Sequence, residues 1–91
     1  MTVTEEAWGQ AIEAVNAAQK IGVVGHVRPD GDALGSMIAL ALGARSVGKD
    51  AVASFGLPFV IGDEFRVLDQ SVLVHPSEFP NALDLAIVCD T

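Results

Sequence analysis

The sequence predicts an α/β domain whose helices cover a parallel sheet, in a three-layer Rossmann-like arrangement. Two observations predict this class, the spacing of apolar residues along the chain and the overall composition. Apolar runs of strand length at residues 21–25 and 50–55 are separated by a helical apolar pattern at residues 33–47. Because a helical crossover lies between them, the two strands are expected to run parallel. The composition agrees, since 51% of the residues are hydrophobic and 19% are charged, which excludes a disordered chain.

A helix is predicted first, over about residues 4–19. Residues 2–5 have the form of a capping box, and Trp8, Ile12 and Val15 follow them at helical spacing. Acidic residues stand in the first turn and a lysine near the end, as the helix dipole favours. We expect this helix to cover one face of the sheet.

The strand at residues 21–25 is built from branched side chains and is expected to be fully buried. His26 stands at its carboxyl end. Pro29 makes the next connection non-helical, because it fixes its own φ and disfavours helical geometry in the residue before it. The chain then turns, and Asp30 or Asp32 is placed to cap the following helix. Polar side chains are thus predicted at the edge where open α/β sheets bind ligands.

The helix predicted at residues 33–47 carries apolar side chains on nearly all faces, which indicates burial between the sheet and other elements. Gly48 supplies its C-terminal stop. Near its start, Gly35 and Ser36 allow either a phosphate contact or close packing of the helix on the sheet. Both interpretations of this pair remain open from the sequence.

Beyond this helix the sequence predicts three further strands. They are expected at residues 50–55, 71–74 and 85–89. Residues 59–68 fit either a loop or a short helix, and residues 76–83, with two prolines, are predicted as a loop. His75 follows residues 71–74 without carboxylate neighbours, so it is interpreted as a structural residue. Asp90, by contrast, directly follows the last predicted strand, which is expected to be buried.

His26, Asp30 and Asp32 place one imidazole and two carboxylates within seven residues. This mixed set of nitrogen and oxygen donors suits manganese, iron, zinc or magnesium. Either aspartate alone is better explained as a turn or cap residue. The three side chains together, at the end of a buried strand, favour a metal site.

The sequence GHVRPDGDALGS at residues 25–36, with His26-x3-Asp30-x-Asp32 inside it, closely resembles the first motif of the DHH phosphoesterase family. Within that family it is most similar to the bacterial nano-RNases that also act as phosphatases on 3′-phosphoadenosine 5′-phosphate. The resemblance implies an α/β catalytic domain that holds two manganese ions, with magnesium or cobalt as alternatives. It implies that His26 and Asp30 bind the first ion, that Asp32 binds the second and that Asp90 bridges both.

The resemblance covers residues 1–91 as the N-terminal part of a DHH catalytic domain. It implies that an Asp-His-His motif, a further aspartate and a C-terminal substrate-binding domain follow, and that the full-length protein is a homodimer. The implied activity is metal-dependent hydrolysis of short oligoribonucleotides to nucleoside 5′-monophosphates, and of 3′-phosphoadenosine 5′-phosphate to AMP. We expect the 91 residues alone to be inactive, because the second metal site would be incomplete.

Other functions remain as alternatives. Cyclic-dinucleotide phosphodiesterases and inorganic pyrophosphatases of the same family carry similar first motifs, and a noncatalytic metal- or nucleotide-binding module is a further hypothesis. A haloacid-dehalogenase-type phosphatase is disfavoured, because His26 holds the place of its nucleophilic aspartate. An EF-hand is disfavoured too, because residues 30–34 lack the third acid of the calcium loop.

The net charge is −7, from twelve acidic and five basic residues, which argues against binding of long nucleic acids. Bound divalent cations would still let phosphorylated nucleotides or short RNA approach. No apolar run reaches the roughly 20 residues of a membrane span, and the N-terminus lacks the features of a signal peptide. A cytoplasmic protein without membrane contact is therefore expected. The single Cys89 excludes an internal disulfide and is interpreted as a small core residue.

Overall fold

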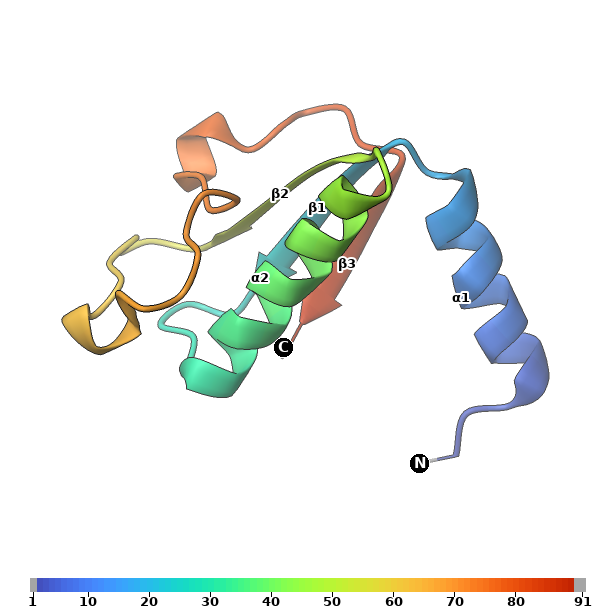
Figure 1. Ribbon diagram of the computed structural model, residues 1–91, viewed down its shortest axis with the longest axis horizontal. Coiled ribbons are helices and arrows are strands. Elements are labelled where there is room, and N and C mark those ends of the chain that lie inside the picture. The colour runs from blue at the N-terminus through green and yellow to red at the C-terminus, as the bar shows by residue number, and fades with distance from the viewer. Residues whose placement is uncertain (1, 90–91) are drawn as a thin grey trace.

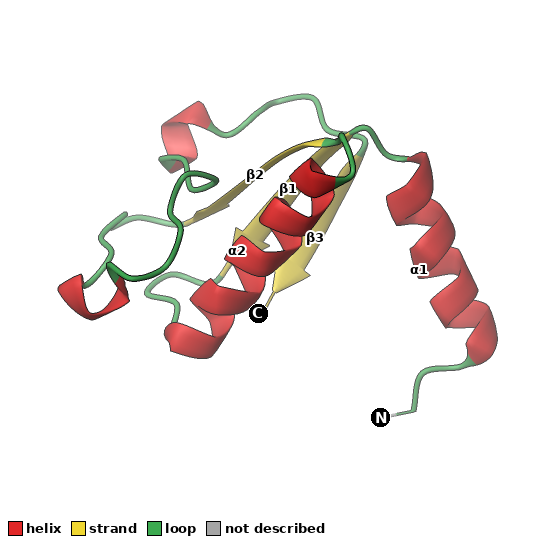
Figure 2. Ribbon diagram, viewed as in Figure 1, coloured by secondary structure: helices red, strands yellow, loops and turns green. Residues whose placement is uncertain are grey.

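The computed structural model describes residues 2–89 (Figure 1). Within them lie helices, parallel strands and two short 3-10 turns (Figure 2). In chain order the elements are α1 (Glu5–Ala17), β1 (Lys20–Gly25), α2 (Gly31–Ser46), β2 (Asp50–Phe55), η1 (Asp63–Phe65), η2 (Pro76–Glu78) and β3 (Leu85–Cys89). The chain is therefore an α/β domain, and three of the four predicted strands are confirmed.

The strands form one parallel sheet of order β2-β1-β3, with β1 in the middle. Gly25 at the end of β1 pairs with Phe55 of β2 and with Cys89 of β3, so all three carboxyl ends lie at one edge. The strand order reverses beside β1, because the chain leaves it for β2 on one side and returns to β3 on the other. In open parallel sheets such a reversal marks the crevice where ligands bind.

α2 covers one face of the sheet and forms the main core with it (Figure 1). The largest fully buried side chains of this core are Ile21, Val23, Leu34, Met37 and Val72. The helix lies so close to β1 that a Cβ at Gly25 would collide with the Met37 side chain. Burial on nearly all faces of this helix is nevertheless wrong, since Leu40 on its outer side is 42% exposed.

On the opposite face, β1 and β2 are covered by residues 76–83, an irregular segment that includes the single turn of η2, rather than by an α-helix. Its side chains pack closely on β1. A Cβ at Gly22 would lie 2.5 Å from the ring of Phe79 and 2.6 Å from the side chain of Leu83. On β3 the same face is open, and Val88 is 56% exposed. The expectation that the last strand is buried is therefore wrong, since none of the residues of β3 is fully buried. A helix therefore covers only one face of the sheet within the described part of the chain.

The strand predicted at residues 71–74 is wrong. Within residues 2–89 this segment meets the sheet at a single isolated bridge, between Leu73 and Ala53 of β2. The Ala53 N–H donates to the Val72 carbonyl and the Val74 N–H to the Ala53 carbonyl, both at 2.9 Å. The Leu73 N–H instead closes a turn within its own segment, so the extended stretch is too short for further pairing.

The other two irregular segments agree with the sequence. Residues 59–68 are a loop that contains the single turn of η1. Residues 76–83 are the expected loop and include the single turn of η2. Apolar contacts hold the first loop, because Phe59, Phe65 and other half-buried side chains pack against the core. The second loop is held by Phe79 and Leu83, which lie against β1 at Gly22.

α1 begins near the predicted position, but the capping box expected at residues 2–5 is wrong, because the N-cap is Thr4, whose Oγ1 accepts the Ala7 N–H at 3.0 Å. The helix ends at Ala17, so Lys20 lies outside its last turn.

The expectation that α1 covers a sheet face is wrong. None of its side chains is fully buried, and Figure 1 shows α1 leaning away from the sheet. The chain bends after the helix, where the N–H groups of Gln19 and Lys20 both donate to the carboxylate of Asp84. These bonds hold the bend that separates α1 from the sheet.

Candidate functional site

The loop that joins β1 to α2 is the centre of the candidate site. Arg28 has a φ of 53°, in the left-handed region that side-chain-bearing residues seldom adopt. This conformation turns the chain from the end of β1 toward the start of α2. Asp30 then caps the helix, because its Oδ1 accepts the Ala33 N–H at 2.8 Å. The predicted cap is thus confirmed and is Asp30 rather than Asp32.

His26 follows the last residue of β1 and is exposed. Its Nδ1 lies 2.7 Å from the carbonyl oxygen of Val27. Because a carbonyl oxygen can only accept, Nδ1 carries the proton in this hydrogen bond. In the neutral ring Nε2 then keeps its lone pair, which is the state in which a histidine binds a metal ion.

A hollow of about 210 Å³ lies between the first turns of α2 and the end of β3. It is lined by Asp30, Asp32, Ala33, Ser36 and Cys89. The hollow is at the carboxyl edge of the sheet and beside the strand at which the strand order reverses. The two carboxylates also stand at the positive end of the α2 dipole, which stabilises negative charge there. The location is the one that the sequence predicts for a ligand site.

The structure gathers only part of the predicted metal site. Asp30 and Asp32 share the hollow, whereas His26 is not among the residues that line it. Within residues 2–89 no group of three or more His, Cys, Asp or Glu side chains is arranged to hold a metal ion. Asp90, the fourth predicted ligand, lies outside the described residues. The hollow therefore offers a pair of carboxylates, with His26 in the same loop.

Gly35 and Ser36 differ in their surroundings. A Cβ at Gly35 would meet no atom within 4 Å, so this glycine does not serve close packing of the helix on the sheet. Ser36 is exposed and lines the hollow, where its hydroxyl can donate to a ligand oxygen. Of the two predicted interpretations, close packing is therefore wrong for Gly35, and a phosphate contact stays a prediction.

Cys89 ends β3 at the wall of the hollow. Its side chain is half-buried and packs against the core. Burial raises the pKa of the Cys89 thiol, because the charged thiolate is poorly solvated there. A thiol that stays protonated at neutral pH is a poor nucleophile. The interpretation of Cys89 as a small core residue agrees with this environment.

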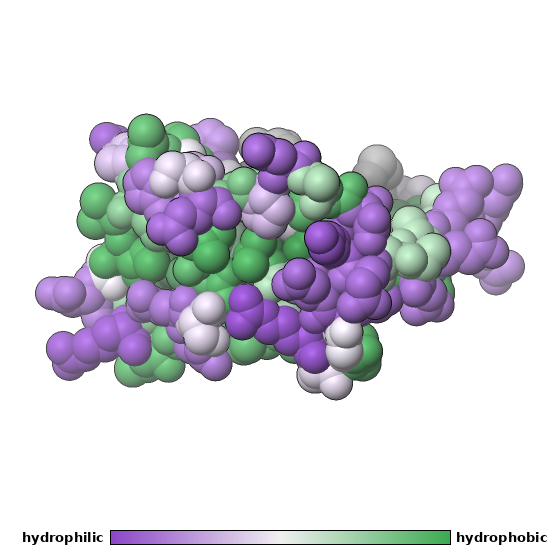
Figure 3. Space-filling view, turned by 90° about the horizontal axis from the view of Figure 1, so that it is seen from above, coloured by the Kyte–Doolittle hydropathy of each residue, from purple (hydrophilic) through white to green (hydrophobic). Residues whose placement is uncertain are grey.

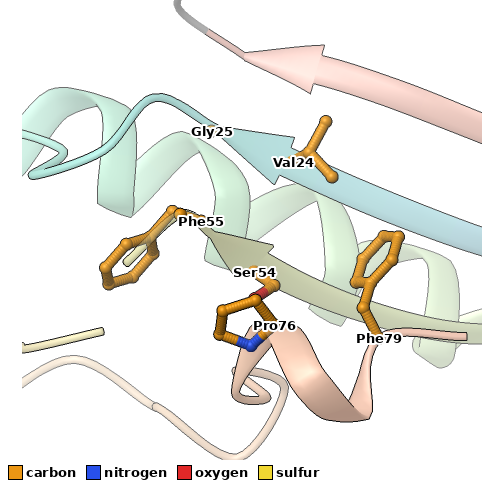
Figure 4. A pocket seen from close by; sticks show the side chains of 7 residues that line it. Val24, Gly25, Ser54, Phe55, Pro76 and Phe79 are labelled. Atoms are coloured by element: carbon orange, nitrogen blue, oxygen red, sulfur yellow. The ribbon is translucent and has the colours of Figure 1, made fainter. Parts of the chain in front are cut away.

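A second hollow, of about 230 Å³, opens at the carboxyl ends of β1 and β2 on the side of the sheet opposite α2 (Figure 4). Its lining is mainly apolar and consists of Val24, Gly25, Ser54, Phe55, Gly56, Pro76 and Phe79. Figure 4 shows Pro76 and Phe79 projecting from η2 and the residue after it toward the two strands. The hydroxyl of Ser54 donates to the Val74 carbonyl at 2.7 Å. Sequence patterns miss this hollow, because segments distant in the chain form it.

His75 has the structural role that the sequence predicts. Its Nδ1 accepts the Ser77 N–H at 3.1 Å, and this contact caps η2. The Ser77 hydroxyl also lies 2.8 Å from the same nitrogen. The ring packs edge-on against Phe59, with the two ring centres 5.6 Å apart. Its Nδ1 is therefore occupied by contacts within the loop.

No model of a known protein family matches the chain. Within residues 2–89 none of the helices is both long and apolar enough to span a membrane. The features of the chain that bear on function are the carboxylate pair, its place in the fold and the motif in the loop before α2.

Proposed function

We propose that this chain forms part of the catalytic domain of a metal-dependent phosphoesterase of the DHH type. The proposed substrates are short oligoribonucleotides, cleaved to nucleoside 5′-monophosphates, and 3′-phosphoadenosine 5′-phosphate, converted to AMP. The observation that carries the proposal is the hollow at the reversal point of the sheet. There Asp30 and Asp32 stand on the start of α2, beside the end of β3.

The donor atoms in and beside the hollow suit a small divalent cation. An imidazole nitrogen of His26 and carboxylate oxygens of Asp30 and Asp32 form a mixed set that fits manganese and also accepts magnesium or cobalt. In this proposal His26 and Asp30 hold one ion, Asp32 helps to hold a second, and Asp90 bridges both. Bound ions would neutralise charge on a phosphate and activate water for its hydrolysis.

Other groups around the hollow are suited to a phosphate group. The first N–H groups of α2 present the positive end of the helix dipole. Ser36 stands further along the same wall and can donate its hydroxyl hydrogen to a phosphate oxygen. Arg28 is exposed and adds a positive charge to the loop between His26 and Asp30. The site thus pairs acids that bind cations with donors that bind the substrate.

The second, apolar hollow favours nucleotides over inorganic pyrophosphate as substrates. It lies at the same edge of the sheet and offers the ring of Phe79 together with Pro76. A nucleobase has a planar apolar face that packs well on such side chains. Inorganic pyrophosphate has no part that would occupy this surface. In this proposal the phosphate of the substrate binds in the hollow at α2, and its base binds in the apolar hollow on the opposite side of the sheet.

A noncatalytic metal- or nucleotide-binding module is the second candidate. The observation that favours it is that the described residues 2–89 gather no three-residue ligand group. A cation held by two carboxylates alone would be bound weakly and with several waters in place. Binding and hydrolysis have to be measured separately to distinguish the two candidates.

The test uses purified protein from the complete reading frame that contains these residues. We expect manganese-dependent release of nucleoside monophosphates from a dinucleotide, and of phosphate from 3′-phosphoadenosine 5′-phosphate, with loss of both on chelation. Cyclic dinucleotides and inorganic pyrophosphate are the competing substrates. Faster turnover of either would favour a different DHH activity. Manganese binding without turnover of any of these substrates would favour the noncatalytic module.

A further inference from the structure

One wall of the apolar hollow at the ends of β1 and β2 is formed by η2. Pro76 lies in this turn and Phe79 directly follows it, and both line the hollow (Figure 4). The Phe79 ring also reaches β1, where it lies against Gly22. Seen from above in Figure 3, hydrophobic side chains are visible between hydrophilic ones on this side of the molecule. The position of η2 therefore sets the shape of the hollow.

η2 is held at its start by the side chain of His75. The turn has two backbone hydrogen bonds, from the Glu78 N–H to the His75 carbonyl at 2.8 Å and from the Phe79 N–H to the Pro76 carbonyl at 3.2 Å. The Ser77 N–H comes before both and donates to Nδ1 of His75 at 3.1 Å. In so short a turn this side-chain contact is one of three bonds.

The His75 ring also joins the turn to the sheet. It packs edge-on against Phe59 with the ring centres 5.6 Å apart, and Phe59 stacks on Phe55 at 4.5 Å. Phe55 is the last residue of β2 and is buried. The bond between Ser77 and Nδ1 therefore links η2 to a fixed part of the core.

This bond requires a neutral His75. Nδ1 accepts the Ser77 N–H, so it has a lone pair, and the proton of the neutral ring lies on Nε2. In the imidazolium form both nitrogens carry hydrogens, and Nδ1 can no longer accept. The Ser77 hydroxyl can rotate to accept from Nδ1, whereas its backbone N–H cannot. His26 is the opposite case, because its Nδ1 donates to the Val27 carbonyl and keeps this contact in both forms.

We propose that His75 is a positioning residue for the apolar hollow and makes its wall sensitive to pH. The neutral ring holds η2, with Pro76 and Phe79, against the ends of the strands. The imidazolium releases the Ser77 N–H and lets this wall move away. Histidine is the side chain whose charge ordinarily changes between about pH 5 and 8. The consequence for nucleotides, weaker binding as the pH falls, rests on the proposed function.

Other charged groups stand on the segments that contact or precede His75. They are Glu78 of η2, Asp63, Glu64 and Arg66 of the loop that carries Phe59, and Asp69, which accepts the Ser71 N–H. Among residues 2–89 none of them is hydrogen-bonded to the His75 ring, whose Nδ1 contacts Ser77. Their charges can shift the pH at which the ring is protonated, but they do not replace the acceptor that the Ser77 N–H loses.

The first experiment follows the turn by NMR in protein from the complete reading frame, between about pH 5 and 8. The signals of the Ser77 amide and the Phe79 ring should shift together with the ring protons of His75. His75→Asn keeps a side-chain acceptor at the cap and gains no charge, so both signals should stay near their positions in the neutral wild type. His75→Ala should resemble the acidic wild type throughout. A Ser77 amide that does not follow the protonation of His75, or that shifts equally in His75→Asn, would overturn the proposal.

The second experiment measures the KM for a dinucleotide over the same pH range. The ratio of the wild-type KM to that of His75→Asn removes the effects of other titrating groups, including His26. This ratio should be close to unity at the alkaline end and at least about threefold higher at the acidic end, with kcat changing equally in both proteins. A constant ratio, with a Ser77 amide that still follows His75, would refute the role of this wall in nucleotide binding. Absence of turnover in both proteins would instead contradict the phosphoesterase, and the NMR result would still decide whether the wall responds to His75.

Discussion

The carboxylate of Asp84 accepts the backbone N–H of Lys20 at 2.8 Å, and in return the Asp84 N–H donates to the Lys20 carbonyl at 2.9 Å. The same carboxylate oxygen accepts the Gln19 N–H at 2.9 Å. Asp84 therefore joins the start of the central strand β1 to the residue before β3. The hydrogen bond from Lys20, and after it the one from Gln19, lowers the pKa of the Asp84 carboxyl.

Because of Asp84, the stability of the fold should decrease as the pH is lowered into the acidic range. A carboxyl whose pKa is lowered by folding stabilises the fold above its unfolded pKa, and this contribution is lost as pH falls through the folded pKa. Asp84→Asn should therefore lower the melting temperature at neutral pH and flatten its fall below about pH 4. Melting curves followed by circular dichroism measure both effects. Asp63→Asn, at an exposed acid in η1, is the control and should keep the wild-type acid dependence.

Gly22 should resist substitution although it lies in a regular strand. In Gly22→Ala the new Cβ would meet the rigid ring of Phe79 at 2.5 Å, so the free energy of unfolding should fall by about 1–3 kcal/mol. Chemical denaturation measures the change. Gly9→Ala has no atom within 4 Å of the new Cβ and should instead stabilise α1 by about 0.5–1 kcal/mol. A Gly22→Ala variant as stable as the wild type would show that the irregular segment packs loosely on β1.

The features that sequence patterns predict here are those that local spacing controls. The branched run at residues 21–25 and the run at 85–89 are strands, because apolar residues of that length suit a buried parallel sheet. Asp30 is predicted as a cap because its side chain acts on the N–H of a residue close in sequence. The edge of the sheet at which His26 lies follows from the order of strand and helix alone.

The features that sequence patterns miss depend on contacts between distant residues. The pattern on α1 shows that an apolar face exists, and it does not identify the surface that covers it. The role of Asp84 depends on Gln19 and Lys20, which lie far from it in sequence. The segment at residues 71–74 has strand-like composition, yet a turn within it limits pairing to one bridge. The apolar hollow beside Phe79 likewise requires the path of a long loop.

Arg28 should carry a strain that glycine relieves. Its φ of 53° costs a side-chain-bearing residue roughly 1–2 kcal/mol, and glycine adopts this conformation readily. Arg28→Gly should therefore leave the free energy of unfolding unchanged or raise it, and Arg28→Val should lower it. In the proposed phosphoesterase, both variants should raise the KM for a dinucleotide, because both remove the positive charge. A wild-type KM in Arg28→Gly would exclude a contact between Arg28 and the substrate.

Substitutions at Asp30 and Asp32 should distinguish the helix-capping role from the proposed metal-binding role. Asp30→Ala removes the acceptor of the Ala33 N–H and should cost about 0.5–2 kcal/mol of stability, whereas Asp30→Asn keeps an acceptor and should cost much less. Asp32 makes no capping bond, so Asp32→Asn loses only its attraction to the α2 dipole and should cost no more than about 0.3–1 kcal/mol. In protein from the complete reading frame, Asp30→Asn and Asp32→Asn should each lower manganese-dependent hydrolysis by at least about a hundredfold. Near-normal turnover of Asp32→Asn at saturating manganese would mean that this carboxylate belongs to the surface of α2 rather than to the site.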